Sequence, residues 1–95
     1  ETTHDNKKII NSSYVILPGV GAFGNAMKQL EKYNLRNTII EYAKSNKPLL
    51  GICLGMQILL TLSYEFGVHK GLGLIEGEVI KISNKNIKSK FKNLN

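Results

Sequence analysis

The hydrophobic positions in the first half of the chain form two short apolar runs, and two segments with helical spacing lie between them. The runs are Tyr14–Leu17 and Leu49–Ile52. Consecutive apolar residues are typical of strands that are buried on both faces of a parallel sheet. Apolar positions spaced at about one helical turn predict helices over residues 26–33 and 35–44, separated at Asn34 and with Asn25 as a candidate cap.

The second half of the chain continues with an apolar stretch over residues 54–64, which predicts a helix directly after the second strand. Residues 66–77 are glycine-rich and predict a loop with a turn at Glu76-Gly77, and residues 78–82 predict another strand. Residues 1–8 show no periodicity. Strands that alternate with helices predict an open α/β sheet with right-handed crossovers, in which ligands bind beyond the carboxyl ends of the strands.

The sequence Gly51-Ile52-Cys53-Leu54-Gly55 places the only cysteine between a predicted strand and a predicted helix. A nucleophile on such a sharp turn needs small residues two positions away on either side, and both of these positions are glycine. The amino-terminal end of the following helix favours the reactive thiolate. A single cysteine is more often a small buried hydrophobic residue, but the symmetric glycines favour a nucleophile elbow.

The longer motif Gly51-Ile52-Cys53-Leu54-Gly55-Met56-Gln57 matches the GxCxGxQ pattern and resembles the nucleophile motif of class I glutamine amidotransferases. Residues 17–24 and 71–79 are similar to the glutaminase subunits of imidazole glycerol phosphate synthases, which act in histidine biosynthesis. The resemblance runs from about Ile9 to Lys81. It implies one partial domain over residues 1–95, about half of the family domain, with a flavodoxin-like open parallel sheet and helices on both faces.

The resemblance also implies a role for several residues. Cys53 would attack the side-chain amide of glutamine and form a thioester. The oxyanion would be held by the backbone of Gly19-Val20-Gly21 and by the N–H of Leu54. Gln57 and Glu65 would bind the substrate, with Glu65 meeting its α-ammonium group, although ordinary surface polarity also accounts for both. No cofactor and no metal are expected, and the partner would be a synthase or cyclase subunit, a (β/α)8 barrel that receives ammonia.

The histidines leave this chemistry incomplete. A cysteine amidase needs a base for the thiol proton, normally a histidine oriented by a carboxylate. His4 and His69 do not match the histidine and glutamate pair of the family. In the family that pair follows much later in the sequence, after a region that has no counterpart in these 95 residues. We therefore expect the 95-residue chain to be inactive as a glutaminase on its own.

Other functions are open to the same residues. The sequence from Gly19 to Gly24 satisfies GxGxxG, but dinucleotide binding also needs an acidic residue at the end of the next strand. Glu41 has about the right spacing and falls inside a predicted helix, which disfavours that function. A paralogous amidotransferase of another pathway, such as surface-sugar biosynthesis, and a non-catalytic binding or regulatory module of the same fold remain as alternatives.

Composition and charge exclude further classes of function. Five of the six net positive charges come from a run of lysines with no acidic residue among them, at positions 81, 85, 88, 90 and 92. Without arginine and with only Phe91 among them, these lysines predict a solvated loop rather than a nucleic-acid site. The single cysteine allows no internal disulfide and fits a reducing compartment. No apolar run reaches the roughly 20 residues that a bilayer requires, so we expect a cytoplasmic protein.

Overall fold

The computed structural model describes residues 2–82, and the lysine-rich loop predicted from residue 83 onward lies outside the described residues. The described helices are α1 Asn6–Ile10, α2 Phe23–Lys32, α3 Arg36–Lys44 and α4 Leu54–Gln57. The described strands are β1 Val15–Leu17, β2 Leu49–Gly51, β3 Leu60–Ser63, β4 His69–Lys70 and β5 Ile75–Val79. Within this part of the chain, no helix combines the length and the apolar character needed to cross a bilayer.

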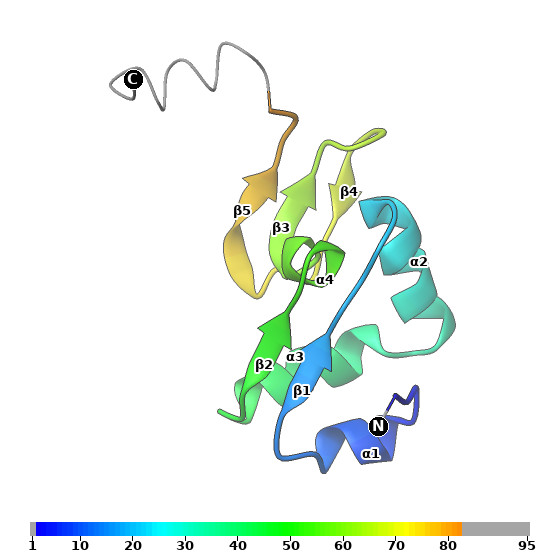
Figure 1. Cartoon of the computed structure of the whole chain (residues 1–95), viewed down its shortest axis with the longest axis vertical. Coiled ribbons are helices and arrows are strands. Elements are labelled where there is room, and N and C mark those ends of the chain that lie inside the picture. The colour runs from blue at the N-terminus through cyan, green and yellow to red at the C-terminus, as the bar shows by residue number, and fades with distance from the viewer. Residues whose placement is uncertain (1, 83–95) are drawn as a thin grey trace.

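The strands form two small sheets, one above the other in Figure 1. Strands β1 and β2 pair in parallel, with Val15 opposite Leu49 and Leu17 opposite Gly51. In the second sheet β3 lies between β4, which is antiparallel to it, and β5, which is parallel to it. Helices connect the parallel strands β1 and β2, so the predicted α/β class is confirmed.

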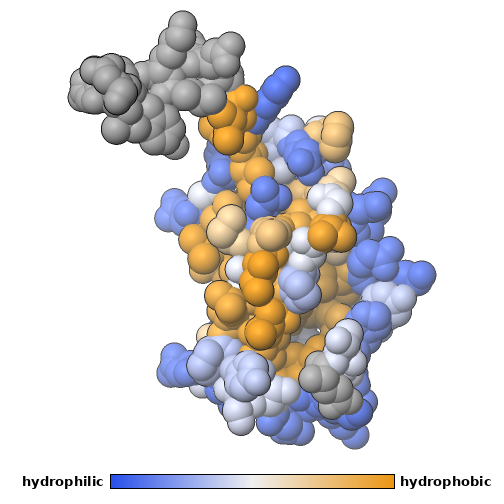
Figure 2. Space-filling model, in the orientation of Figure 1, coloured by the Kyte–Doolittle hydropathy of each residue, from blue (hydrophilic) through white to orange (hydrophobic). Residues whose placement is uncertain are grey.

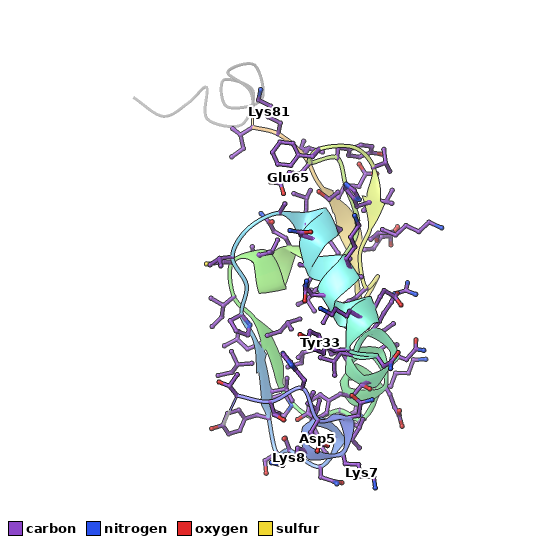
Figure 3. All side chains as sticks on the ribbon, turned by 90° about the vertical axis from the view of Figure 1, so that its right-hand side faces the viewer. Asp5, Lys7, Lys8, Tyr33, Glu65 and Lys81 are labelled. Carbon is purple, nitrogen blue, oxygen red and sulfur yellow. The ribbon has the colours of Figure 1, made fainter. Side chains whose placement is uncertain are left out.

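Helices α2 and α3 supply much of the core because each buries one side chain per helical turn. In α2 these residues are Phe23, Met27 and Leu30, and α3 contributes Ile39 and Tyr42. The two helices lie on one side of β1 and β2 (Figure 3), where the partly buried strand residues pack against the core. Spacing at i, i+4 and i+7 places such residues on one helix face, as the sequence predicts.

The other face of β1 and β2 is exposed among the described residues. Ile16 is 49% exposed and its register partner Leu50 is 56% exposed. Figure 2 shows the resulting apolar strip over the two strands. The prediction that both strands are buried on both faces is therefore wrong for residues 2–82, because only the face toward α3 is covered.

The helix boundaries differ from the predicted ones at their amino-terminal ends. Asn25 lies inside α2, which begins at Phe23 after the N-cap residue Ala22, so the predicted cap at Asn25 is wrong. The predicted interruption at Asn34 is present, since this residue adopts φ 55° between α2 and α3. Helix α1 was not predicted. It forms because the Asp5 carboxylate accepts hydrogen bonds from the backbone of the first turn.

The helix predicted over residues 54–64 is wrong after Gln57. Helix α4 ends there, and the apolar residues that follow form β3. The carbonyl oxygen of Ile58 accepts a hydrogen bond from the N–H of Leu72 at 2.7 Å, and that of Leu59 accepts one from Leu74 at 2.9 Å. These carbonyl groups would be needed to continue the helix. A short apolar run fits a strand as well as a helix, and here pairing with distant residues decided the outcome.

The predictions after β3 are correct in part. The predicted loop contains the short strand β4, and the predicted strand over 78–82 is present but shifted, because β5 spans Ile75–Val79. The turn predicted at Glu76-Gly77 is wrong, since both residues lie inside β5.

Candidate active site

Cys53 lies between β2 and α4 in a backbone conformation that few residues other than glycine adopt. Its dihedral angles are φ 55° and ψ −121°, and its thiol is free and exposed. A positive φ in a non-glycine residue carries strain and is often found at functional sites. The chain thus has the strand, turn and helix predicted around Cys53, although the helix is a single turn.

The glycines on either side of Cys53 are required by close packing. A Cβ atom at Gly51 would lie 2.8 Å from the carbonyl oxygen of Gly55 and 2.8 Å from the Cα of Met56. A Cβ atom at Gly55 would collide with the backbone carbonyl of Leu17, at the end of β1. The turn at Cys53 therefore packs backbone against backbone on the neighbouring strand, which only glycine permits.

The glycine loop after β1 lies against this turn because β1 and β2 are adjacent and parallel. A Cβ atom at Gly19 would lie 3.0 Å from the Cβ of Leu54. The N–H of Ile52 donates to the carbonyl oxygen of Leu17 at 3.0 Å, which extends the pairing of the two strands up to the turn. Gly21 has φ 102°, so the loop also uses a conformation that favours glycine.

A cavity of about 350 Å³ lies where the loop and the turn meet. Every residue that the sequence suggested for the site lines it, together with Met56, which sequence reasoning did not select. Met56 is 54% exposed. The sequence feature that could have identified Met56 as a site residue is its position next to Gln57 in the GxCxGxQ motif. The lining residues are Gly19, Val20, Gly21, Cys53, Leu54, Met56, Gln57 and Glu65.

The cavity contains a backbone donor with no acceptor among the described residues. The N–H groups of Gly55, Met56 and Gln57 all donate to carbonyl oxygens of the turn. The N–H of Leu54 donates to none of the atoms described in residues 2–82. A carbonyl oxygen of a ligand bound next to Cys53 can therefore accept this hydrogen bond, as in an oxyanion hole.

Glu65 lies in an environment different from the predicted one. The sequence places it at the carboxyl end of a helix, but it follows β3 and its Oε1 accepts a hydrogen bond from the N–H of Phe23 at 3.0 Å. The half-buried carboxylate therefore lies at the amino-terminal end of α2, where the helix dipole favours a negative charge. A carboxylate at the carboxyl end of a helix would have met the negative end of the dipole, so the observed position of Glu65 is the more favourable one.

Neither histidine lines the Cys53 cavity. His4 stacks on Tyr33 with ring centroids 4.2 Å apart. His69 lies in a second hollow of about 420 Å³, and its Nε2 is 3.1 Å from the carbonyl oxygen of Phe66. The described part of the chain thus places no histidine in the cavity of Cys53, and it holds no group of three His, Cys, Asp or Glu side chains suited to a metal ion.

The acidic residue required for dinucleotide binding is also misplaced. Glu41 lies within α3, and the strand that follows, β2, leads into Cys53 rather than into a carboxylate. The glycine-rich loop is instead packed on the cysteine turn.

A strained, exposed cysteine between a parallel strand and a helix, with a glycine loop packed against it, defines an α/β protein of the nucleophile-elbow class. The family model described as Glutamine amidotransferase class-I matches residues 1–95. The chain therefore belongs to the class I glutamine amidotransferase family, whose domain is flavodoxin-like, as predicted.

Relatives of known name support this assignment. The chain is 58% identical over 73 residues to the imidazole glycerol phosphate synthase subunit HisH of Wolinella succinogenes, covering 77% of this chain and 36% of the relative. It is 50% identical over 78 residues to HisH of Aquifex aeolicus, with coverage of 82% and 38%, and 55% identical over 76 residues to HisH of Sulfurimonas denitrificans, with coverage of 80% and 37%. The match thus spans well under half the length of each relative.

Proposed function

We propose that this chain is the nucleophile-bearing part of a glutaminase subunit that releases ammonia from glutamine for a synthase of histidine biosynthesis. The observation that carries the proposal is the packing of the glycine loop against the strained turn at Cys53, with both lining one cavity. The similarity to HisH subunits favours this pathway over the alternatives of a paralogous amidotransferase and a non-catalytic module.

The reaction proceeds in two covalent steps. The thiolate of Cys53 attacks the side-chain amide carbon of glutamine, the carbon–nitrogen bond breaks, and ammonia leaves with a proton supplied by the general acid. Water then attacks the thioester carbon, releases glutamate and restores the thiol. A histidine outside the matched segment serves as the base and acid, because His4 and His69 lie away from the cavity.

The oxyanion of each step is stabilised by backbone donors. The N–H of Leu54, which has no acceptor within residues 2–82, supplies one hydrogen bond, and the backbone of Gly19, Val20 and Gly21 supplies a second. Removal of one such donor in other enzymes lowers kcat by about 10² to 10³. The close approach of Gly19 to Leu54, where an added Cβ atom on Gly19 would lie 3.0 Å from the Cβ of Leu54, supports this pairing of the two donors.

The substrate is oriented by the polar side chains of the cavity. Gln57 is one helical turn after Cys53, and its amide hydrogen-bonds the amino acid portion of glutamine. The carboxylate of Glu65 pairs with the α-ammonium group.

The ammonia passes to a synthase subunit, a (β/α)8 barrel docked over the cavity. Such a partner is needed because ammonia that escapes into water near neutral pH is protonated and no longer nucleophilic. A cytoplasmic, reducing compartment fits this chemistry because it keeps the thiol of Cys53 free.

The test is covalent trapping in the whole protein with its partner. A diazoketone analogue of glutamine is expected to add one adduct, located on Cys53 by peptide mass spectrometry, and to abolish ammonia release from glutamine. The Cys53→Ser variant should neither release ammonia nor take up the label. Labelling at another residue, or turnover by Cys53→Ser, contradicts the proposal. Residues 1–95 alone should release no ammonia, because the base is missing.

A further inference from the structure

Glu65 caps helix α2 although it is 42 residues away along the chain. The N-cap residue Ala22 makes no side-chain hydrogen bond, and the first turn of α2 contains no acidic residue. The N–H of Phe23 would therefore lack a protein partner without Glu65. Figure 3 shows Glu65 at the first turn of α2. A side chain from the turn after β3 thus provides the cap that the local sequence of α2 does not encode.

Both ends of this link are held in place. The backbone N–H of Glu65 donates to the Oγ of Ser63 at 3.1 Å, and Ser63 is fully buried. The preceding residue, Tyr64, donates its N–H to the carbonyl oxygen of Val79 on β5 at 3.0 Å. At the other end, the side chain of Phe23 is fully buried in the core. The hydrogen bond therefore connects two rigid parts of the fold.

The glycine loop lies between this link and the cysteine turn. One end of the loop is set by the contact of Gly19 with Leu54, and the other end runs into Phe23. A Cβ atom placed on Gly21 would meet nothing within 4 Å, so packing does little to hold the middle of the loop. Its position depends on its two ends.

We propose that Glu65 is a positioning residue for the glycine loop, in addition to its role toward the substrate. This inference rests on the proposed function, since the loop is the one that supplies an oxyanion donor. By holding the N–H of Phe23, the carboxylate sets where the loop enters α2 and so keeps its backbone next to Cys53. Substrate binding and the placement of the oxyanion hole then depend on the same side chain.

The two roles use different properties of the carboxylate and can be separated by substitution. A carboxylate has about four acceptor positions on its two oxygens, so Oε1 can accept from Phe23 while the group also meets an ammonium ion. Pairing with the ammonium group needs the negative charge. Holding Phe23 needs only a hydrogen-bond acceptor at the right distance, which the amide oxygen of Glu65→Gln preserves.

The kinetic experiment uses the whole protein with its synthase partner. Glu65→Gln is expected to raise KM for glutamine by roughly tenfold or more through the lost charge, with kcat within about threefold of the native value. Glu65→Ala is expected to raise KM similarly and to lower kcat by about 10- to 100-fold, because a small misplacement of catalytic groups has effects of this size. The exposed residue Glu76 of β5 provides the control, and Glu76→Ala should change neither constant. Equal kcat values for the alanine and glutamine variants would overturn the inference.

A second measurement does not depend on glutaminase activity. Hydrogen exchange of the Phe23 amide should be roughly tenfold faster in Glu65→Ala, as expected for a lost hydrogen bond to a charged group, and nearly unchanged in Glu65→Gln and Glu76→Ala. If the alanine variant does not fold, Glu65→Asp replaces it. Aspartate keeps the negative charge, but its shorter side chain moves the carboxylate oxygen away from the N–H of Phe23. Unchanged exchange of the Phe23 amide in Glu65→Ala, or in Glu65→Asp where it replaces the alanine variant, overturns the positioning role. If the native protein shows no turnover, the proposed function fails, and the exchange result alone decides whether Glu65 holds the loop.

Discussion

Two hollows of similar size on the surface of residues 2–82 differ in how they are built. The hollow at His69 is the larger, about 420 Å³ against 350 Å³ at Cys53, and it gathers the side chains of Lys28, Arg36, His69 and Lys70. Its charged side chains come from α2, α3 and β4. The cavity at Cys53 is lined by a glycine loop, the turn at Cys53, the short helix α4 and the carboxylate residue Glu65.

Under the proposed function, the difference shows why size and the presence of reactive side chains do not identify a catalytic site. At His69 the ion pair between Arg36 and Glu31 is long, at 3.6 Å, and its side chains are 39% and 64% exposed. Such a pair contributes little in water. At Cys53 the N–H of Leu54 has no acceptor among residues 2–82, and in the proposed reaction a backbone donor of this kind needs no reorganisation. Under the proposed function, backbone constraint therefore marks the site better than volume does.

The largest expected difference between the two hollows is in turnover. Cys53→Ala should lower kcat for glutamine hydrolysis by at least about 10³-fold, because a lost nucleophile removes the covalent pathway. His69→Ala should leave kcat within about threefold of the native value, because the ring lies outside the cavity. Steady-state ammonia release in the whole protein measures both. A loss in His69→Ala comparable to that in Cys53→Ala would show that the two hollows act together.

The second largest difference between the two hollows is expected in stability, measured as the free energy of unfolding. Gly55→Ala should lower the free energy of unfolding by about 3 kcal/mol or more, because its methyl group meets the rigid backbone of Leu17. The matched variant is Gly24→Ala in α2, where the new methyl group would lie 2.8 Å from the ring of His69. That ring can move away, and alanine improves helix propensity by about 1 kcal/mol, so the net change should stay within about 1 kcal/mol. Urea denaturation compares the two, and equal losses would show that the turn at Cys53 is no more rigid than the His69 hollow.

A smaller loss of stability is expected at glycines where there is room for a side chain but the backbone has a positive φ that disfavours one. Gly21 has φ 102° and Gly73 has φ 68°, and an added Cβ atom meets nothing within 4 Å at either residue. Alanine at each position should lower the free energy of unfolding by about 1 to 2 kcal/mol through backbone strain. Only Gly21→Ala should also lower kcat, because only Gly21 belongs to the loop at Cys53. A normal kcat in Gly21→Ala would remove that loop from the mechanism.

The smallest effect is expected at the ion pair of the larger hollow. Glu31→Ala should change the free energy of unfolding by no more than about 0.5 kcal/mol, and 1 M salt should reduce that difference further. Thermal or urea unfolding at low and high salt measures it. A change as large as that of Gly55→Ala would mean that the hollow at His69 is held as firmly as the cavity at Cys53.

The sequence by itself determined the elements whose signal is local. Apolar residues at one per helical turn predicted α2 and α3, and the runs around Val15 and Leu49 predicted the parallel pair β1 and β2. Glycine at positions 51 and 55 predicted a tight turn at the cysteine, because only a backbone that approaches another closely needs glycine at both places. The resemblance to amidotransferases suggested the remaining site residues, and all of them line one cavity.

The tertiary structure decided what depends on distant partners. The run after Gln57 became β3 because residues 72–75 donate hydrogen bonds to the carbonyl groups of Ile58, Leu59 and Leu60, a pairing that no local pattern encodes. Glu65 was expected at a helix end and instead caps the start of α2, at Phe23. Only the fold could place Leu17 under Gly55 and Gly19 against Leu54. Local periodicity sets which segments are helical or extended, whereas contacts between residues far apart in the chain set where a single carboxylate or amide points.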